Sequence, residues 1–357
     1  MGDIPSRSAN ATAGDLGVTS GHSSGAGSGA SPSRYEEPPI GGGGAALPKK
    51  ARFSMETGFR GISTAAGAMV LVIIIAIAVF LISKAIPALN ENTVNFFTYN
   101  RWAPNADAPA FGIAVLALGT LLSSVIALVV AVPIALAIAL FLTHYAPRRL
   151  ATPLGFVIDL LAAVPSVVFG LWGRDVLQEP VRDFSVWLNH YFGWIPIFGG
   201  EGPFGQSIML GGLVLAIMVL PIVTSLSREV FQQTPGMNEE AALALGATKW
   251  EMVRIAVLPY GKPGVIAAVM LGLGRALGET IALALTLGIT WEISFNLIQT
   301  GGNSIAANIA NSFGEANDTG RGALIASGLL LFAITLVVNM TARAIIYRRR
   351  EFRDSAA

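Results

Sequence analysis

Cysteine is absent from the 357-residue sequence, and histidine occurs only three times. Without cysteine the chain forms no disulfide, no thiolate nucleophile and no zinc site with cysteine ligands. The histidines at positions 22, 144 and 190 are far apart, and no HExxH pattern occurs. This scattering argues against a catalytic metal site, so we expect the chain to bind no metal.

Charged residues are also scarce. They make up 13% of the chain, whereas hydrophobic residues make up 53% and the mean hydropathy is +0.62. Soluble domains carry about 25% charged residues, so the composition is typical of a membrane protein. The formal net charge is +1, which leaves no excess of basic residues to favour nucleic-acid binding.

The first 55 residues differ from the rest because they contain few large apolar side chains. Gly, Ser, Ala and Pro dominate, as in the runs 23–33 and 41–44. Such a segment buries too little apolar surface to offset the entropy of ordering, which predicts a disordered cytoplasmic tail over residues 1–55. It also lacks the apolar core of a secretory signal. Residues 56–350 are then expected to form a transmembrane domain, with a short cytoplasmic end at 351–357.

Six stretches contain enough apolar residues, about 20, to cross the hydrocarbon core of a bilayer as a helix. We therefore predict an all-α integral membrane protein with six transmembrane helices. Pro133 is expected to kink the second stretch, and Pro259 and Pro263 are expected to break the chain before the fifth. The six stretches are Ile62–Ile86, Phe111–Thr143, Leu150–Trp172, Gln206–Leu226, Pro263–Trp291 and Gly322–Tyr347.

The distribution of Lys and Arg predicts the orientation of these helices. One side of the bundle carries most of the basic residues, and such a side faces the cytoplasm. Both termini are therefore expected to be cytoplasmic. The basic side holds Lys49, Lys50, Arg52, Arg60, Arg148, Arg149, Arg228, Lys249, Arg254, Lys262, Arg343, Arg348, Arg349, Arg350 and Arg353, and the opposite side holds Lys84, Arg101, Arg174, Arg182 and Arg321.

The loop between the fourth and fifth stretches, residues 228–262, is predicted to form a helical elbow on the cytoplasmic side. One short helix is expected over Asn238–Leu245, ended by Gly246 in the left-handed conformation. Thr248, with Glu251 three residues later, forms a capping box that starts a second short helix.

The residues of this elbow resemble the EAA coupling loop of the permeases of binding-protein-dependent ABC importers, the MetI-like family. That pattern is E-A-A, three residues, Gly, nine residues, an apolar residue, one residue and Leu-Pro. The apolar position, where Ile is usual, holds Ala256 with Ile255 beside it. The other positions are matched by Glu240, Ala241, Ala242, Gly246, Leu258 and Pro259.

The resemblance implies that this loop docks in a groove of a separate ATPase subunit and transmits its closure to the membrane helices. Lys249, Trp250 and Arg254 suit such an interface, since Trp and Arg are frequent anchors. The sequence contains no GxxxxGK[ST] stretch. ATP is therefore expected to be used by the partner ATPase, and this chain is expected to bind no cofactor itself.

Three charged residues lie within the predicted transmembrane stretches, where charges are costly and point to function. They are Asp159 in the third stretch and Arg275 and Glu279 in the fifth. Four residues separate Arg275 from Glu279, so both are expected on one helix face. A guanidinium fork suits an oxyanion, and either carboxylate would partly neutralise it. The alternative is a structural ion pair that fixes helix packing.

A narrower resemblance connects the chain with the permeases of phosphate importers. The stretch 272–280, which contains Arg275 and Glu279 in the sequence GRALGET, and the stretch 163–173 are similar to signatures of that group, as are Gly112, Gly119 and Thr120. The resemblance implies a role in transport for Arg275 and Glu279. It also implies three kinds of partner in the bacterial plasma membrane system: a second permease subunit, a dimer of ATPase subunits and an extracytoplasmic phosphate-binding protein.

The residues themselves leave the substrate open. An intramembrane Arg is compatible with sulfate, molybdate or an amino acid carboxylate as well as with phosphate. A passive anion channel or a scaffold for a sensor protein is a further alternative, and the coupling loop is the feature that argues against both. No constellation of nucleophile and base or of metal ligands occurs in the predicted stretches, which argues against an enzyme.

Overall fold

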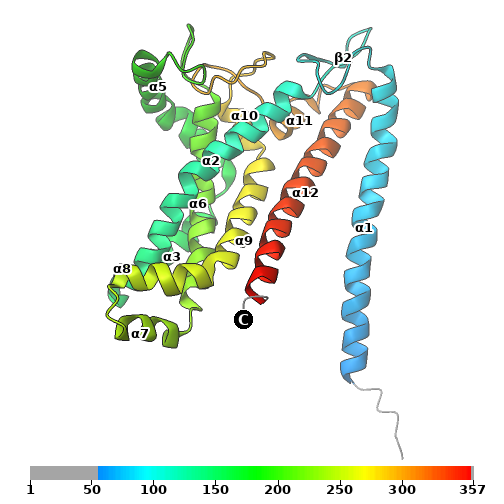
Figure 1. Cartoon of the computed structure of the whole chain (residues 1–357). Coiled ribbons are helices and arrows are strands. Elements are labelled where there is room, and N and C mark those ends of the chain that lie inside the picture. The colour runs from blue at the N-terminus through cyan, green and yellow to red at the C-terminus, as the bar shows by residue number, and fades with distance from the viewer. Residues whose placement is uncertain (1–54, 355–357) are drawn as a thin grey trace, which may run out of the picture. The chain divides into compact units, whose positions relative to one another are not determined.

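The computed structural model describes the chain from Met55 to Asp354, and from Ile62 onward the chain forms one compact unit. The predicted tail therefore lies outside the described residues except for its last residue, as do residues 355–357. Helices dominate the described part (Figure 1), with three π-helical turns labelled η. The elements are α1 (Met55–Glu91), β1 (Trp102–Ala103), β2 (Ala110–Phe111), α2 (Ala114–Leu140), η1 (Phe141–Tyr145), α3 (Arg148–Ala162), α4 (Ser166–Trp172), η2 (Gly173–Leu177), α5 (Gln178–Phe192), α6 (Ile208–Gln232), α7 (Gly236–Ala244), α8 (Lys249–Met252), η3 (Val253–Val257), α9 (Leu258–Leu277), α10 (Ile281–Thr286), α11 (Ile305–Ser312) and α12 (Asp318–Asp354).

The described part contains five helical segments long and apolar enough to cross a membrane, and one bent pair that brings the number to six if it counts as one span. This confirms the predicted all-α membrane fold. The five segments are Gly58–Glu91, Ala114–Tyr145, Ile208–Gln232, Lys249–Leu277 and Asp318–Ala344.

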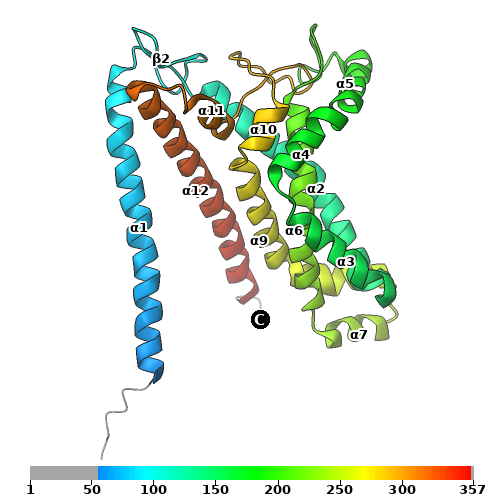
Figure 2. The same ribbon diagram turned by 180° about the vertical axis from the view of Figure 1, so that it is seen from behind.

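The third predicted span is the bent pair, so the single helix predicted over Leu150–Trp172 is interrupted. The chain stops being helical after Ala162, resumes at Ser166 and turns by 92° between the two limbs (Figure 2). Pro165 explains the break, because it has no N–H to donate and its ring disfavours the helical conformation of Val164. The second limb continues through η2 into α5 as far as Phe192.

The fifth predicted span is displaced. The prolines do not break the chain, because Lys249–Leu277 is helical throughout: Pro259 falls in the first turn of α9, directly after η3. The helical run changes direction on the way from α8 to α9 (Figure 1). The helix ends at Leu277 rather than near Trp291, since Gly278 caps it and the short α10 begins at Ile281.

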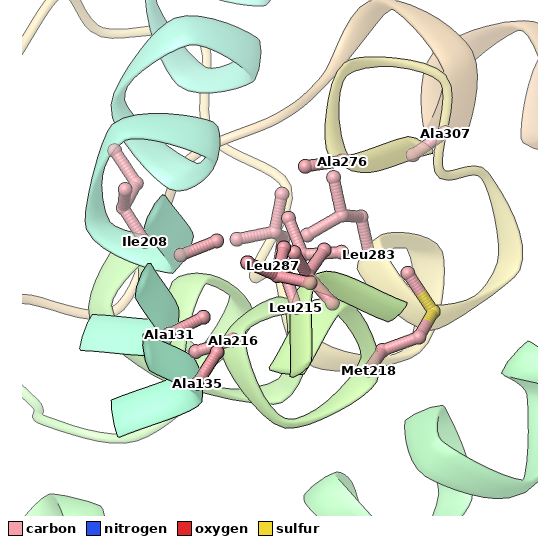
Figure 3. Close-up of a cluster of buried hydrophobic side chains, with 13 residues drawn as sticks. Ala131, Ala135, Ile208, Leu215, Ala216, Met218, Ala276, Leu283, Leu287 and Ala307 are labelled. Atoms are coloured by element: carbon pink, nitrogen blue, oxygen red, sulfur yellow. The ribbon is translucent and has the colours of Figure 1, made fainter. Parts of the chain in front are cut away.

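The core lies where α2 and α6 cross, with α9, α10 and α11 packed around it. On α2 the contact surface is a row of fully buried alanines, and Ala216 of α6 lies beside Ala131 and Ala135 (Figure 3). Small side chains let helix backbones approach closely, which is the main source of helix association in a lipid environment. The buried alanines on α2 are Ala127, Ala131 and Ala135.

On the opposite side from α7, a short antiparallel ladder follows α1 before α2 begins. It pairs Trp102 with Phe111 and Ala103 with Ala110. Phe111 is fully buried against Ala88 of α1 and Ala323 of α12. This small cluster connects the end of α1 to the beginning of α12, while no residue in the most apolar stretch of α1 is buried within the described chain.

Candidate functional site

The helical elbow predicted between the fourth and fifth spans is present as α7 and α8. Gly246 ends α7 with a φ of +87°, in the left-handed region. Thr248 and Glu251 form the complete capping box at α8: the Glu251 backbone N–H donates to Thr248 Oγ1 over 3.3 Å, and the Thr248 backbone N–H donates to Glu251 Oε2 over 2.8 Å. These contacts make the turn between α7 and α8 rigid.

The elbow is attached to the membrane helices through a small apolar cluster. Ala242 of α7 and Met252 of α8 are buried there, together with Phe231 of α6 and Ala139 of α2. Ala242 is the second alanine of the coupling pattern, and its small size lets α7 lie close to the bundle. The first alanine, Ala241, is exposed together with Glu240.

The outer surface of the elbow exposes large apolar side chains that no other part of the described chain covers. Leu245 is 90% exposed, Met237 80% and Trp250 57%. Lys249 and Arg254 are exposed as well, and Leu258 and Pro259 lie where η3 passes into α9. Exposed large apolar side chains next to basic ones are typical of an interaction surface. The two sides of the elbow therefore differ, one fixed to the bundle and one open.

Asp159 does not meet Arg275. Its Oδ2 accepts a hydrogen bond from Arg228 Nη2 at 2.9 Å, and its Oδ1 accepts one from Ser225 Oγ at 2.8 Å. Both partners belong to α6, so the carboxylate of α3 connects these two helices. This is the structural ion pair that the sequence left open, but with a different arginine.

Glu279 does not pair with Arg275 either. The helix ends between them, at Leu277, so the spacing of four residues no longer places them on one helical face. Glu279 is 8% exposed, and its Oε1 accepts a hydrogen bond from the backbone N–H of Ala282 at 3.2 Å. The carboxylate thus stabilises the first turn of α10, where the backbone N–H groups have no helical partner.

Arg275 lines a cavity of about 610 Å³ between α6, α9 and α12. Arg343 and Asn339, both on α12, line the same cavity, and none of its lining residues is acidic. Among the side chains that the structure describes, no carboxylate forms an ion pair with Arg275. The remaining lining residues are Ile222, Ala267, Met270, Leu271, Gly274 and Ala342.

Sequence reasoning placed Arg343 among the basic residues of the cytoplasmic side and did not consider Asn339. Nothing local to α12 indicates which of its faces turns toward α9. The structure therefore adds two polar residues from α12 to Arg275 and separates Asp159 and Glu279 from it. Two guanidinium groups and a carboxamide in a cavity without carboxylates form a site whose chemistry suits an oxyanion.

Comparison with known proteins identifies the family. Residues 117–351 match the family described as binding-protein-dependent transport system inner membrane component. The chain belongs to this family. The match covers the elbow, the cavity and, apart from residues 114–116, the membrane-spanning segments that follow α1, so the protein is a multi-pass inner-membrane component of a transport system.

Relatives within the family are similar over most of their length. The phosphate transport system permease protein PstC 2 of Mycobacterium tuberculosis is 49% identical over 292 residues, which cover 80% of this chain and 90% of the relative. PstC of Mycobacterium leprae is 48% identical over 273 residues, with 75% and 86% covered. PstC of Xylella fastidiosa strain Temecula1 is 42% identical over 294 residues, with 81% and 90% covered.

A solved structure shows the same fold. It is the crystal structure of a bacterial ABC transporter involved in the import of the acidic polysaccharide alginate. Its chain matches with a TM-score of 0.50 and 16% sequence identity, and the match covers 80% of this chain and 98% of the other. This inner-membrane component therefore has the helical fold of an ABC transporter permease.

Proposed function

We propose that the chain is one permease subunit of an ATP-driven phosphate importer and forms half of its translocation pathway. The cavity between α6, α9 and α12 carries this proposal, because it offers two guanidinium groups and no carboxylate. The name of the relatives, which are up to 49% identical, supports phosphate as the anion.

Arg275 is the main substrate contact in this proposal. Its side chain is exposed and faces the cavity, so its forked donors are available to two oxygens of one anion. Arg343 and Asn339 add donors from the opposite helix. A cavity without carboxylates does not repel a phosphate that carries one to two negative charges, whereas an acidic lining would.

Glu279 and Asp159 act on the pathway through the structure rather than by touching the anion. Glu279 caps α10 and so fixes the break in the chain directly after the helix that bears Arg275. Asp159 ties α3 to α6, and α6 supplies Ile222 to the cavity lining. Both carboxylates therefore help to keep the shape of the cavity.

The exposed side of the elbow is the proposed docking surface for a separate ATPase. Glu240, Ala241, Gly246, Lys249, Trp250 and Arg254 are exposed there, next to the uncovered Met237 and Leu245. ATP is hydrolysed by that partner, and this chain supplies no nucleotide site. The buried Ala242 and the Leu258–Pro259 step connect the docking surface to α9 and hence to the cavity.

The complete importer then contains a second permease subunit, a dimer of ATPase subunits and an extracytoplasmic phosphate-binding protein. The excess of Lys and Arg on the side of the elbow supports a cytoplasmic location in a bacterium for both termini of this chain. The β1–β2 ladder and α5 then lie on the outer side, where the binding protein delivers its ligand.

Purification from mild detergent followed by reconstitution in liposomes tests the proposal. We expect an ATPase and a second multi-pass subunit to copurify, and we expect the vesicles to take up radiolabelled phosphate only when ATP and the binding protein are present. If sulfate at equal concentration competes with phosphate for uptake, the substrate is another oxyanion rather than phosphate. Uptake by this chain alone, without ATP, would establish a passive channel instead.

A further inference from the structure

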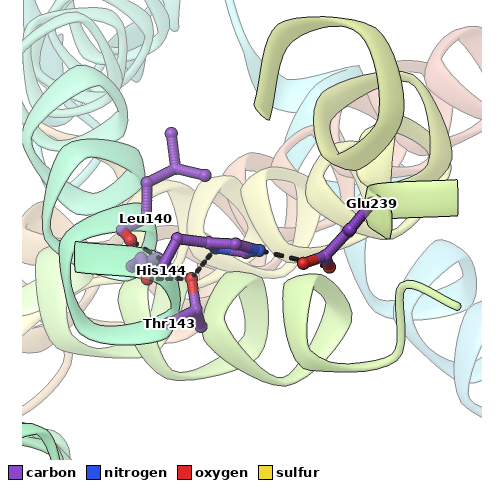
Figure 4. A network of polar contacts seen from close by, with 5 residues as sticks. Leu140, Thr143, His144 and Glu239 are labelled. Carbon is purple, nitrogen blue, oxygen red and sulfur yellow. Dashed lines mark hydrogen bonds and ion pairs between the residues drawn. The ribbon is translucent and has the colours of Figure 1, made fainter. Parts of the chain in front are cut away.

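His144 lies in the π turn η1 at the cytoplasmic end of α2, and its side chain is only 8% exposed. Figure 4 shows the imidazole between Thr143 of its own turn and Glu239 of α7. The Thr143 Oγ1 atom is 2.6 Å from Nδ1, and the Glu239 Oε1 atom is 3.4 Å from Nε2. One ring therefore connects the end of a membrane helix to the elbow.

The direction of the contact follows from its acceptor. A carboxylate oxygen only accepts hydrogen bonds, so the Nε2–H group of His144 donates to Glu239 Oε1. On the other side of the ring, Nδ1 shares a hydrogen bond with the Thr143 hydroxyl, whose oxygen is also 2.9 Å from the Ala139 carbonyl.

Glu239 connects this hydrogen bond to the coupling pattern. It lies in the first turn of α7, immediately before Glu240 of that pattern. Within residues 58–344, whose side chains the structure describes, no other side-chain hydrogen bond or ion pair joins α7 or α8 to another helix. The remaining attachment of the elbow is the apolar cluster around Ala242.

Apolar contacts and hydrogen bonds constrain a short helix differently. Burial of apolar surface has no preferred direction, so this cluster holds α7 against the bundle without a directional bond. A hydrogen bond requires a narrow range of distance and angle. Breaking this one would also leave a nearly buried ring without its partner. The His144–Glu239 contact is therefore the directional side-chain contact between α7 and the end of α2 among the described residues.

The route from this contact to the substrate cavity is short. α2 packs along α6 through the alanine row of the core, and α6 contributes Ile222 to the cavity. A displacement of α7 that moves the end of α2 is therefore passed to the helix that forms one wall of the cavity. A close-packed interface transmits such a shift because it cannot be compressed.

We propose that His144 and Glu239 are positioning residues of the coupling machinery, which make the end of α2 follow the movement of α7. The inference rests on the proposed function, since it presupposes an ATPase docked on the elbow. It goes beyond the coupling pattern, because neither His144 nor Glu239 belongs to that pattern.

The experiment uses the complete importer reconstituted in liposomes and measures phosphate transported per ATP hydrolysed. His144→Ala and Glu239→Ala are each expected to lower this ratio by about tenfold, the lower end of the effect of one lost hydrogen bond to a charged group. The double variant is expected to be no worse than either single variant, because both remove the same contact. The control is Ser83→Ala on α1, whose exposed hydroxyl donates to the Phe80 carbonyl of its own helix, and which is expected to keep the ratio of the unchanged importer.

Conservative variants separate positioning from folding. Glu239→Gln keeps an oxygen that accepts from Nε2, so we expect its ratio to stay near that of the unchanged importer even if Glu239→Ala assembles poorly. An unaltered ratio in His144→Ala overturns the inference, and so does a double variant whose loss is the product of the two single losses. Failure of the unchanged importer to transport phosphate would instead refute the proposed function.

Discussion

The guanidinium of Arg228 lies directly over Gly155 of α3, at a point where any Cβ would overlap its Nη1 atom. The absence of a side chain at Gly155 lets Arg228 cross the surface of α3 and reach Asp159, one turn further along that helix. The Asp159–Arg228 ion pair therefore depends on Gly155, which is not itself a member of the pair. This arrangement attaches one limb of the bent third span to α6.

Gly155→Ala is accordingly expected to destabilise the protein. The added methyl displaces the flexible end of Arg228 and leaves Asp159 with only its bond to Ser225, and the loss of this partly exposed ion pair costs about 1 kcal/mol. The melting temperature in detergent measures the effect. Gly328→Ala is the matched control, because a Cβ there would make an ordinary contact of 3.6 Å with Ile309. Equal melting temperatures for the two variants would show that Arg228 has room to move aside.

Arg275→Gln is expected to stop phosphate uptake while the importer still assembles, because only the charge and the forked donors are lost. Arg275→Lys is expected to be partly active at best, since an ammonium group is a point charge without the planar fork. Uptake in reconstituted vesicles and the amount of copurified ATPase are measured together. Near-normal uptake by Arg275→Gln contradicts its role as the main substrate contact.

Arg343→Gln tests the part of the cavity formed by α12. Removal of one charge-assisted contact to the anion is expected to raise the KM for phosphate about tenfold, with a smaller effect on the maximal rate. Arg321→Gln is the matched control, because Arg321 belongs to the same helix, is exposed and does not line the cavity. An unchanged KM in Arg343→Gln would restrict the site to Arg275 and its own helix.

Glu279 provides a test between a structural and an electrostatic role. Glu279→Gln removes the charge but keeps a side-chain oxygen that accepts from the Ala282 N–H, so we expect this variant to assemble and to transport phosphate. Glu279→Ala removes the acceptor and is expected to cost about 1 kcal/mol of stability at α10. Vesicle uptake and the melting temperature in detergent are measured for both variants. Loss of uptake in Glu279→Gln with normal assembly would show that the charge itself acts on the anion.

Gly246 tests the rigid elbow through its backbone. Gly246→Val is expected to abolish ATP-driven uptake while the protein still reaches the membrane, because a branched side chain disfavours the left-handed conformation. No atom lies within 4 Å of an added Cβ, so the effect is conformational rather than steric. Gly246→Asn is the control, since Asn tolerates this conformation and is expected to retain uptake. If Gly246→Val takes up phosphate as well as Gly246→Asn does, the turn does not need to be rigid.

Much of the fold follows from local signals in the sequence. The length of the apolar stretches predicts the spans, and the Thr248–Glu251 spacing and Gly246 predict the elbow, because each signal acts through residues a few positions apart. The break at Pro165 is different. This proline lies within an apolar stretch long enough to be one helix, and hydropathy alone does not reveal that the two limbs turn by 92°.

The sequence by itself determined that the protein crosses the membrane repeatedly, carries a capped elbow between two spans and has an arginine within the fifth. Only the tertiary structure decided the partners of the charged residues. Asp159 and Arg228 are 69 residues apart, and His144 and Glu239 are 95 apart. Such pairings depend on which faces of distant helices pack together, and that choice is made by close packing of the whole bundle rather than by any local pattern.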